Sequence, residues 1–291
     1  MNWVTCLLLI CATNGAWAAT TKADSVVTLR ASYASLGEQL RQNQFNQPLV
    51  LKSAETPNGL RGDIYAVVDF PFSAVSAGLS NPDHWCDVMI LHINTKFCHA
   101  VADSSGTVLK VNFGRKTPEE LIYTTRVEFN YSADVATSDY MGVMLNAKDG
   151  PLGTSDYRIL LEAMALPDAK AFLHFRYSYT MNIAGRLAMQ TYLGTVGKDK
   201  VGFTVSSMRA DGQADYIGGV RGLVERNTMR YYLAIDSFLG AMGAAPAVQL
   251  ERRLQSWFTA TERYPRQLHE INRDEYLVMK RAEHSRQQIV H

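Results

Sequence analysis

The spacing of apolar residues changes twice along the chain, from a helical period to a period of two and back. Residues 29–43 repeat apolar side chains every three or four positions, which predicts a short amphipathic helix. The residues that carry this stripe are Leu29, Tyr33, Leu36 and Leu40. A turn at residues 56–59 and a strand at residues 62–70 follow, and Ser73 is expected to N-cap one or two short helices within residues 72–92.

The central region alternates apolar and polar residues, which is typical of strands with one buried face. Short turns join these segments, and we therefore expect an antiparallel sheet, since parallel strands need long crossover connections. Residues 132–155 are expected to be irregular. The predicted strands are residues 94–102, 107–115, 121–131, 157–166, 171–181, 187–193 and 201–205.

Aromatic side chains gather on one face of two of these strands. They are Tyr123, Phe129 and Tyr131 on the first, and Phe175, Tyr177 and Tyr179 on the second. Charged residues alternate away from this face, and we interpret them as solvated cross-strand charges. These charged residues are Arg126, Glu128, Glu162 and Arg176.

The helical period returns at residues 222–239 and predicts a long amphipathic helix. Its stripe consists of Leu223, Val224, Asn227, Tyr231, Ile235 and Phe238. Of these, Leu223, Tyr231, Ile235 and Phe238 are expected to face inward, whereas Glu225, Arg226 and Asp236 are expected to stay in water. Gly218, Gly219 and Gly222 before this helix lack the Lys-Ser/Thr ending of a phosphate-binding loop, and we interpret them as a connection with unusual backbone angles. A further helix is predicted from Pro246, with Pro265 interrupting it.

This order of elements resembles the START/Bet v 1-like (SRPBCC, helix-grip) superfamily. Residues 62–239 carry the resemblance, with the opening GDIYAVVDFPFSAVSAGLSNPDHWCDVM, which includes Trp85, and the closing RGLVERNTMRYYLAIDSFL. The resemblance implies an α+β fold in which a curved antiparallel sheet grips a long C-terminal helix, with N- and C-terminal helical extensions. Together with the apolar N-terminal stretch, which has the layout of a signal peptide (1–18), it divides the chain into a helical lead-in (19–59), a START-like domain (60–242) and a C-terminal helical extension (243–291).

The resemblance also implies an apolar cavity between sheet and helix. Tyrosine suits such a site because its ring is apolar and its hydroxyl can fix the polar end of a ligand. The alternative is that the same side chains fill an ordinary core. The cavity-lining candidates are Tyr123, Phe129, Tyr131, Phe175, Tyr177, Tyr179 and Tyr231.

The four cysteines indicate where the protein works. Cys6 and Cys11 lie in an apolar stretch, residues 1–18, that ends in Ala-Trp-Ala and has the layout of a secretory signal peptide; an uncleaved anchor is the alternative. Cys86 and Cys98 remain in the mature chain, where an oxidising compartment favours a disulfide worth about 3 kcal/mol. A metal site with His84, Asp87, His92 and His99, or two free thiols, are the alternatives.

Composition narrows the function. A net charge of +1 argues against a nucleic-acid binder, and 47% apolar residues supply a full core. The chain has no Gly-x-Ser-x-Gly motif, and we expect no metal and no cofactor.

The leading hypothesis is a monomeric periplasmic or secreted protein that binds or carries a lipid or other hydrophobic small molecule. A cyclase- or hydrolase-type cavity enzyme and a non-catalytic envelope interaction protein are alternatives. The basic, aromatic tail could make peripheral membrane contact, but its interleaved acidic residues favour packing on the domain or on a partner.

Overall fold

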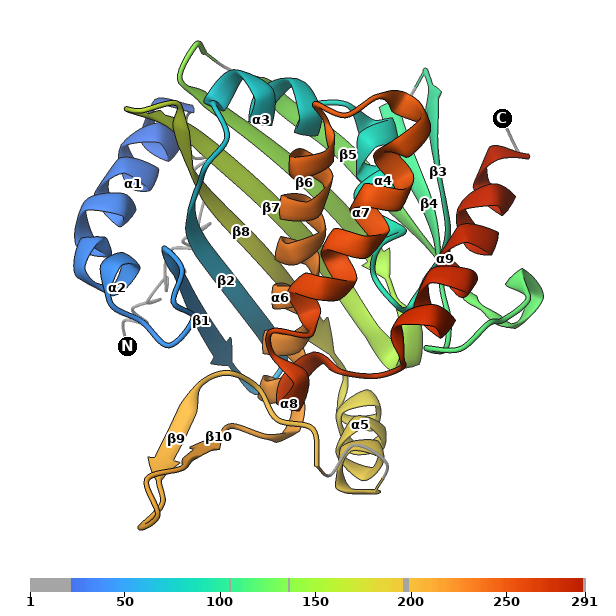
Figure 1. The fold of residues 1–291 in the computed structure, drawn as a ribbon. Helices are drawn as coiled ribbons and strands as arrows, with labels where there is room; N and C mark the ends of the chain where they lie inside the picture. The colour runs from blue at the N-terminus through green and yellow to red at the C-terminus, as the bar shows by residue number, and fades with distance from the viewer. Residues whose placement is uncertain (1–21, 105, 136, 196–198, 290–291) are drawn as a thin grey trace, which may run out of the picture.

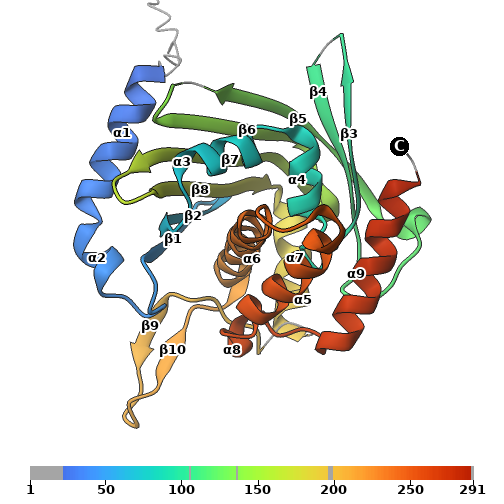
Figure 2. The ribbon, with the colours of Figure 1, turned by 45° about the horizontal axis from the view of Figure 1, so that its top comes forward.

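An eight-stranded antiparallel sheet curves around one long helix (Figures 1 and 2). The computed structural model describes residues 22–104, 106–135, 137–195 and 199–289, so the predicted signal peptide lies outside the described residues. The strand order is β1-β2-β8-β7-β6-β5-β4-β3, in which β2 pairs with β8. The strands are β1 Leu49–Glu55, β2 Gly59–Val68, β3 Thr95–Asp103, β4 Gly106–Phe113, β5 Thr125–Val135, β6 Tyr140–Asp149, β7 Thr154–Leu166 and β8 Lys170–Met181.

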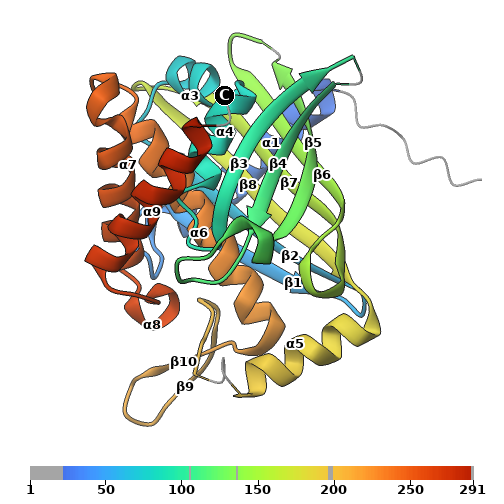
Figure 3. The same cartoon turned by 90° about the vertical axis from the view of Figure 1, so that its right-hand side faces the viewer.

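Helices cover both faces of this sheet. The long helix α6 packs against β1, β2 and β8, and α7 lies outside α6 (Figure 3). Two short helices, α3 and α4, contact α6, and α9 runs beside β3. The helices are α1 Lys22–Ser35, α2 Gly37–Arg41, α3 Phe72–Leu79, α4 Pro82–Met89, α5 Ile183–Thr195, α6 Gly219–Ala241, α7 Pro246–Thr261, α8 Pro265–Leu268 and α9 Arg273–Gln288, with 3-10 turns η1 Leu121–Tyr123 and η2 Pro151–Gly153. This arrangement confirms the predicted α+β helix-grip fold.

Two apolar clusters lie on opposite faces of the sheet. The larger joins the inner face to α3, α4, α6, α7 and α9, and it includes Met141 and Val143 of β6. The smaller packs α1 and α2 against the outer face, where Leu29 and Phe172 meet Tyr140, the first residue of β6. The middle strands are therefore covered on both sides.

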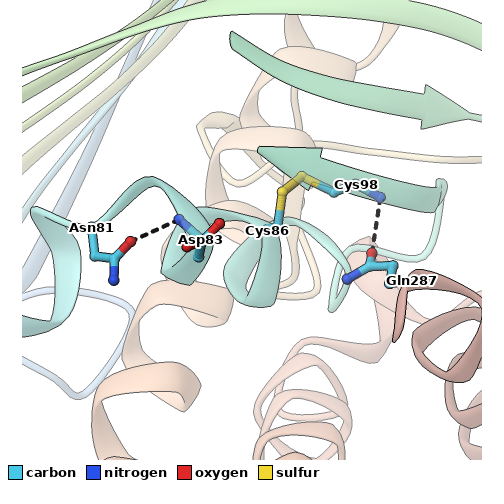
Figure 4. The surroundings of a disulfide bond; sticks show 5 residues. All are labelled: Asn81, Asp83, Cys86, Cys98 and Gln287. Carbon is cyan, nitrogen blue, oxygen red and sulfur yellow. Dashed lines mark hydrogen bonds between the residues drawn. A yellow bond between two sulfur atoms is a disulfide. The ribbon is translucent and has the colours of Figure 1, made fainter. Parts of the chain in front are cut away.

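The predicted disulfide between Cys86 and Cys98 is confirmed (Figure 4). It joins α4 to β3, with Cα atoms 5.1 Å apart. The Asn81 side chain caps the start of α4 by accepting from the Asp83 N–H, and the Cys98 N–H donates to the Gln287 side chain of α9 at 2.9 Å. The bridge therefore stands where α4, β3 and α9 meet.

Several predicted elements are confirmed with shifted ends. The N-terminal helical stripe forms α1 and α2, the two short helices are α3 and α4, and α6 contains the whole of the predicted long helix. The strand predicted at residues 121–131 begins only at Thr125, because residues 121–123 form a 3-10 turn. Pro71, rather than Ser73, precedes the first turn of α3.

Other predictions were wrong. Residues 187–193 belong to the helix α5 instead of a strand, and the stretch expected to be irregular contains β6. β1 was not predicted; it adds an edge strand beside β2. The predicted strand at residues 201–205 reaches only the first residue of β9 (Val205–Met208), which forms a small hairpin with β10 (Ala214–Tyr216). This hairpin and α5 extend below the sheet in Figure 1.

The solvated positions predicted on the long helix required correction. Glu225 and Arg226 are buried, because the segment between α5 and α6 covers this side of the helix. The Glu225 carboxylate accepts from the N–H groups of Phe203 and Thr204 at 2.6 and 2.9 Å. Asp236 is half-buried, and burial raises its pKa.

The glycines in the first turn of α6 have the backbone role that the sequence predicted. Gly219 has φ +61°, a left-handed conformation that L side chains rarely adopt. At Gly222 a Cβ atom would lie 2.8 Å from the Ile217 carbonyl oxygen, so a side chain is excluded there. Across the described residues, no helix combines the length and apolarity needed to cross a bilayer.

Candidate functional site

A cavity of about 470 Å³ lies between the inner face of the sheet and α6. Strands β4, β5, β7 and β8 supply its walls, α6 covers it, and the loop after α4 reaches one side. Its lining residues are His92, Asn94, Phe113, Gly114, Arg115, Glu119, Tyr123, Thr125, Val127, Phe129, Pro151, Leu152, Thr154, Tyr157, Tyr177, Tyr179, Met189, Leu223, Asn227 and Tyr231.

Four tyrosines form a continuous aromatic wall. Tyr157 stacks on Tyr179 with ring centroids 5.1 Å apart, and Tyr177 lies 5.4 Å from Tyr231. The hydroxyls of Tyr157 and Thr154 share a hydrogen bond of 2.8 Å. Burial raises the pKa of Tyr177 well above 10, and those of Tyr179 and Tyr231 also rise. All these hydroxyls are therefore neutral at physiological pH and can donate to a ligand or accept from it.

His92 lies at the buried side of the cavity. Its ring stacks on Tyr231 at 4.6 Å, and its Nδ1 accepts from the Asn94 N–H at 3.2 Å. Burial lowers the pKa of His92, and the nearby cations Arg230, Lys280, Lys116 and Lys96 lower it further. The imidazole is therefore neutral at physiological pH, and its proton is on Nε2, because Nδ1 serves as an acceptor.

The mouth of the cavity carries exposed apolar side chains. Tyr123 and Leu152 line the cavity, yet they are 74% and 73% exposed. α5 contributes Met189 to the lining and leaves Ile183 and Leu187 exposed on the same helix. Exposed apolar side chains that gather in one region often mark a contact with a ligand, protein or membrane.

The structure brings five of the seven predicted cavity residues together. Tyr123, Phe129, Tyr177, Tyr179 and Tyr231 line the cavity, although Tyr123 lies in a 3-10 turn rather than on a strand. Phe175 is packed in the core, where its ring lies 6.3 Å from Tyr231. Tyr131 points toward the short helices: its hydroxyl donates to the Ser80 carbonyl at 2.7 Å, and burial raises its pKa to about 12.

Sequence reasoning missed other lining residues. Tyr157 follows the same inward alternation as its neighbours in β7 and could have been found from that pattern. Asn227 lies one helical turn before Tyr231, so the stripe of α6 also contained it. His92 carried no such signal, because it lies in the loop between α4 and β3.

The charges on the outer face are of two kinds. Arg126 and Glu128 form an exposed ion pair, as predicted. Glu162, in contrast, is largely buried: it accepts from His174 Nδ1–H at 2.9 Å and from the Tyr140 hydroxyl at 2.9 Å. Arg176 is partly buried and donates to Asp63. The prediction that Glu162 and Arg176 are solvated was therefore wrong.

Asp63 and His174 are the buried centre of this outer cluster. His174 Nε2–H donates to Asp63 Oδ1 at 2.8 Å, and Arg176 Nε–H donates to the same oxygen at 2.8 Å. Burial lowers the pKa of His174, but its hydrogen bonds to Asp63 and Glu162 outweigh that effect and leave the pKa raised. Burial would raise the pKa of Asp63, yet His174 and Arg176 lower it to about 2.

Metal ligation finds no support in the part of the chain that the structure describes. There, no group of three or more His, Cys, Asp or Glu side chains could hold a metal ion. The two cysteines of the alternative metal site form the disulfide. His84 instead interacts through Nδ1 with the Gly78 carbonyl at 2.7 Å.

Comparisons with known proteins give matches only among solved structures. No protein-family model matches the sequence, and no curated protein matches it. Similar structures include a conserved protein from Geobacillus kaustophilus (11% identity, TM-score 0.36, 63% of this chain and 95% of that one). They also include truncated norcoclaurine synthase from Thalictrum flavum (14%, 0.33, 50% and 91%) and human StAR-related lipid transfer protein 5 (9%, 0.30, 56% and 85%). At these identities and TM-scores, the matches carry no information on ligand or reaction.

Proposed function

We propose that this chain, which has the helix-grip fold of the START/Bet v 1-like superfamily, binds a lipid or another hydrophobic small molecule in its cavity. The observation that carries the proposal is the cavity of about 470 Å³ with its aromatic wall. Ligand sites are typically concave and mostly apolar, with a few polar groups that fix orientation. Export to the periplasm or the extracellular space, as a monomer, is part of the same proposal.

The ionisable groups in the cavity favour binding over a reaction. A cavity enzyme needs two titratable groups that converge on a substrate. Glu119 is engaged by Arg115, whose backbone N–H donates to Oε2 at 2.7 Å and whose side chain lies 3.4 Å from Oε1. His92 is neutral and its Nδ1 already accepts a hydrogen bond. We therefore rank a carrier above a cyclase or hydrolase.

The third hypothesis, an envelope interaction protein with a filled core, predicts no internal volume. The cavity contradicts that prediction. The apolar side chains exposed at its mouth, Tyr123 and Leu152, instead offer a ligand an apolar route inward. We propose that this mouth, rather than the C-terminal tail, makes any peripheral membrane contact.

Two measurements test the proposal. Organic extraction of the purified protein followed by mass spectrometry should release a lipid or another hydrophobic molecule in stoichiometric amount. After extraction, the refolded protein should bind the neutral dye Nile red, whose fluorescence rises in apolar surroundings. A protein that yields no extractable molecule and leaves Nile red fluorescence unchanged would contradict the proposal.

A further inference from the structure

The cavity contains a hydrogen-bond donor that the protein itself does not satisfy. Nε2 of His92 has no hydrogen-bond partner among the described residues, and the side chain is 3% exposed. Nearly all buried polar atoms in proteins are paired, because a buried donor without a partner costs free energy. An unpaired donor on a ring that lines a cavity therefore points to a ligand that supplies the acceptor.

A second donor lines the same cavity. Asn227 is one helical turn before Tyr231, the ring on which His92 stacks, and it also lines the cavity. Its side-chain oxygen faces Arg230 Nη1 at 3.5 Å, and a guanidinium can only donate. The oxygen of this amide is therefore directed to Arg230, and its NH₂ group remains to donate into the cavity.

The charges behind these donors are mostly positive. Arg230, Lys116 and Lys200 share the single carboxylate of Glu270. Lys96 and Lys280 share that of Glu283. Arg115 and Glu119, which line the cavity itself, pair with each other. The tally is therefore six cations and three carboxylates, and the excess positive charge favours an anion over a cation in the adjacent space.

We infer that His92 and Asn227 form the polar end of the ligand site and bind the carboxylate of an amphipathic ligand, whose hydrocarbon part lies against the aromatic wall. Two donors and an excess of cations suit a carboxylate, which only accepts hydrogen bonds. A protonated amine has no acceptor to offer and is repelled. This inference rests on the proposed function and adds the chemical class of the ligand.

Competition against bound Nile red tests the inference. Dodecanoate and dodecylamine have the same chain length and differ at the polar end. The extracted wild-type protein should bind dodecanoate at least about tenfold more tightly than dodecylamine. His92→Phe, which keeps an aromatic ring beside Tyr231, and Asn227→Leu should each weaken dodecanoate binding by about ten- to a hundredfold, as loss of a hydrogen bond to a charged group does.

Matched controls separate the possible failures. His269→Phe, which makes the same substitution at an exposed histidine that does not line the cavity, should retain dodecanoate affinity within about twofold. Because Asn227 is only half-buried, its variant supplies the test if His92→Phe does not fold. Equal binding of acid and amine, or unchanged dodecanoate affinity in a folded variant that still binds Nile red, would overturn the inference. Failure of the wild type to bind Nile red would overturn the proposed function itself.

Discussion

At the scale of single residues, burial lowers the pKa of both His92 and His174, and their charged neighbours then shift the two pKa values in opposite directions. His92 lies among cations, and its pKa is lowered; His174 lies between two carboxylates, and its pKa is raised. The sequence could not distinguish them, since several of the charged neighbours that shift each pKa are distant in the chain. Asp63, for example, is 111 residues from His174.

The raised pKa of His174 predicts a pH-dependent contribution to stability. A histidine whose pKa is higher in the folded than in the unfolded protein stabilises the fold. This stabilisation is complete below the unfolded-state pKa, about 6.5, and is lost as the pH rises through the folded-state pKa. Asp63, whose pKa is lowered to about 2, loses its own contribution only as the pH falls from about 4 toward 2. His174→Gln should therefore lower the free energy of unfolding more at pH 5.5 than at pH 9.

Urea denaturation of the wild type and His174→Gln at both pH values checks this prediction. The difference between the two proteins is the relevant quantity, because the lowered pKa of His92 gives the wild type an opposite slope below pH 6.5. His269→Gln is the control: His269 is exposed beside Glu262, and exposed pairs contribute little. An equal destabilisation by His174→Gln at both pH values would refute the ion-paired state of His174.

Phe238 and Tyr231 lie on the same helix, α6, but their replacement by alanine should have different effects on stability and on ligand uptake. Phe238 is fully buried, with the Arg253 guanidinium 4.4 Å above its ring, so Phe238→Ala should cost about 3–5 kcal/mol of stability. Tyr231 is also buried, at 5% exposed, but it lines the cavity and forms part of the aromatic wall that a ligand would contact. Tyr231→Ala should reduce Nile red uptake more strongly than it reduces stability in urea. Equal destabilisation by the two variants would indicate that Tyr231 belongs to a filled core.

At the scale of elements, the sequence predicted those strands whose two faces differ. β5 and β8 alternate because one face meets the core, and that pattern was recognised. β6 was missed because both faces are buried, Met141 and Val143 inside and Tyr140 under α1, so its sequence does not alternate. α5 was mistaken for a strand because a short apolar run fits both the helical period of 3.6 residues and the strand period of two.

The anchoring of the segment before α6 depends on Glu225. Its carboxylate accepts from two backbone N–H groups and from the hydroxyls of Ser53 and Thr204. Glu225→Ala leaves these donors unpaired and should cost about 1–3 kcal/mol. Hydrogen exchange should accelerate at the amides of Phe203 and Thr204, while β7 and β8 stay protected.

Glu225→Gln is the matched control for this prediction. A glutamine oxygen can still accept from both amides, and the two hydroxyls can rotate to accept from its NH₂ group. Exchange at Phe203 and Thr204 should therefore remain slow in this variant. Equally slow exchange in Glu225→Ala would show that the segment is held by other contacts.

The disulfide should stabilise the junction of α4 and β3. It closes a loop across 12 positions, and by chain-entropy arguments its removal in Cys86→Ala/Cys98→Ala should cost about 3 kcal/mol. Guanidinium denaturation of both proteins, without reductant, measures the cost. Labelling of either cysteine by iodoacetamide in the native, unreduced wild type would contradict the bond.

At the scale of the whole molecule, the order of elements predicted the sheet, the long helix and the existence of an aromatic inner face. It did not predict what surrounds them. α1 covers the outer face and buries Glu162, and the segment between β8 and α6 buries Glu225. Both corrections concern polar residues whose burial depends on segments outside the sheet and the long helix.

The apolar mouth of the cavity predicts how a ligand enters. α5 contributes Met189 to the cavity lining and exposes two apolar side chains, Ile183 and Leu187, to which a ligand or vesicle could first bind. Because both are exposed, their replacement by serine should change stability by less than about 0.5 kcal/mol. Ile183→Ser/Leu187→Ser should nevertheless slow the transfer of a fluorescent fatty acid from vesicles to the protein. Val278→Ser, an exposed change on α9, is the control. Unchanged transfer rates in the double variant would place the entry route elsewhere.

The most direct test of the account is native mass spectrometry of a protein whose cavity has been filled. Leu223 lines the cavity from α6 and is half-buried, so Leu223→Trp should occupy the space without disturbing the sheet. Val248→Trp, at an exposed position on α7, is the matched control. The wild type and Val248→Trp should each retain a bound hydrophobic molecule, and folded Leu223→Trp should have the mass of the protein alone. An empty wild type, or the same bound mass in Leu223→Trp, would contradict the claim that this cavity is the ligand site.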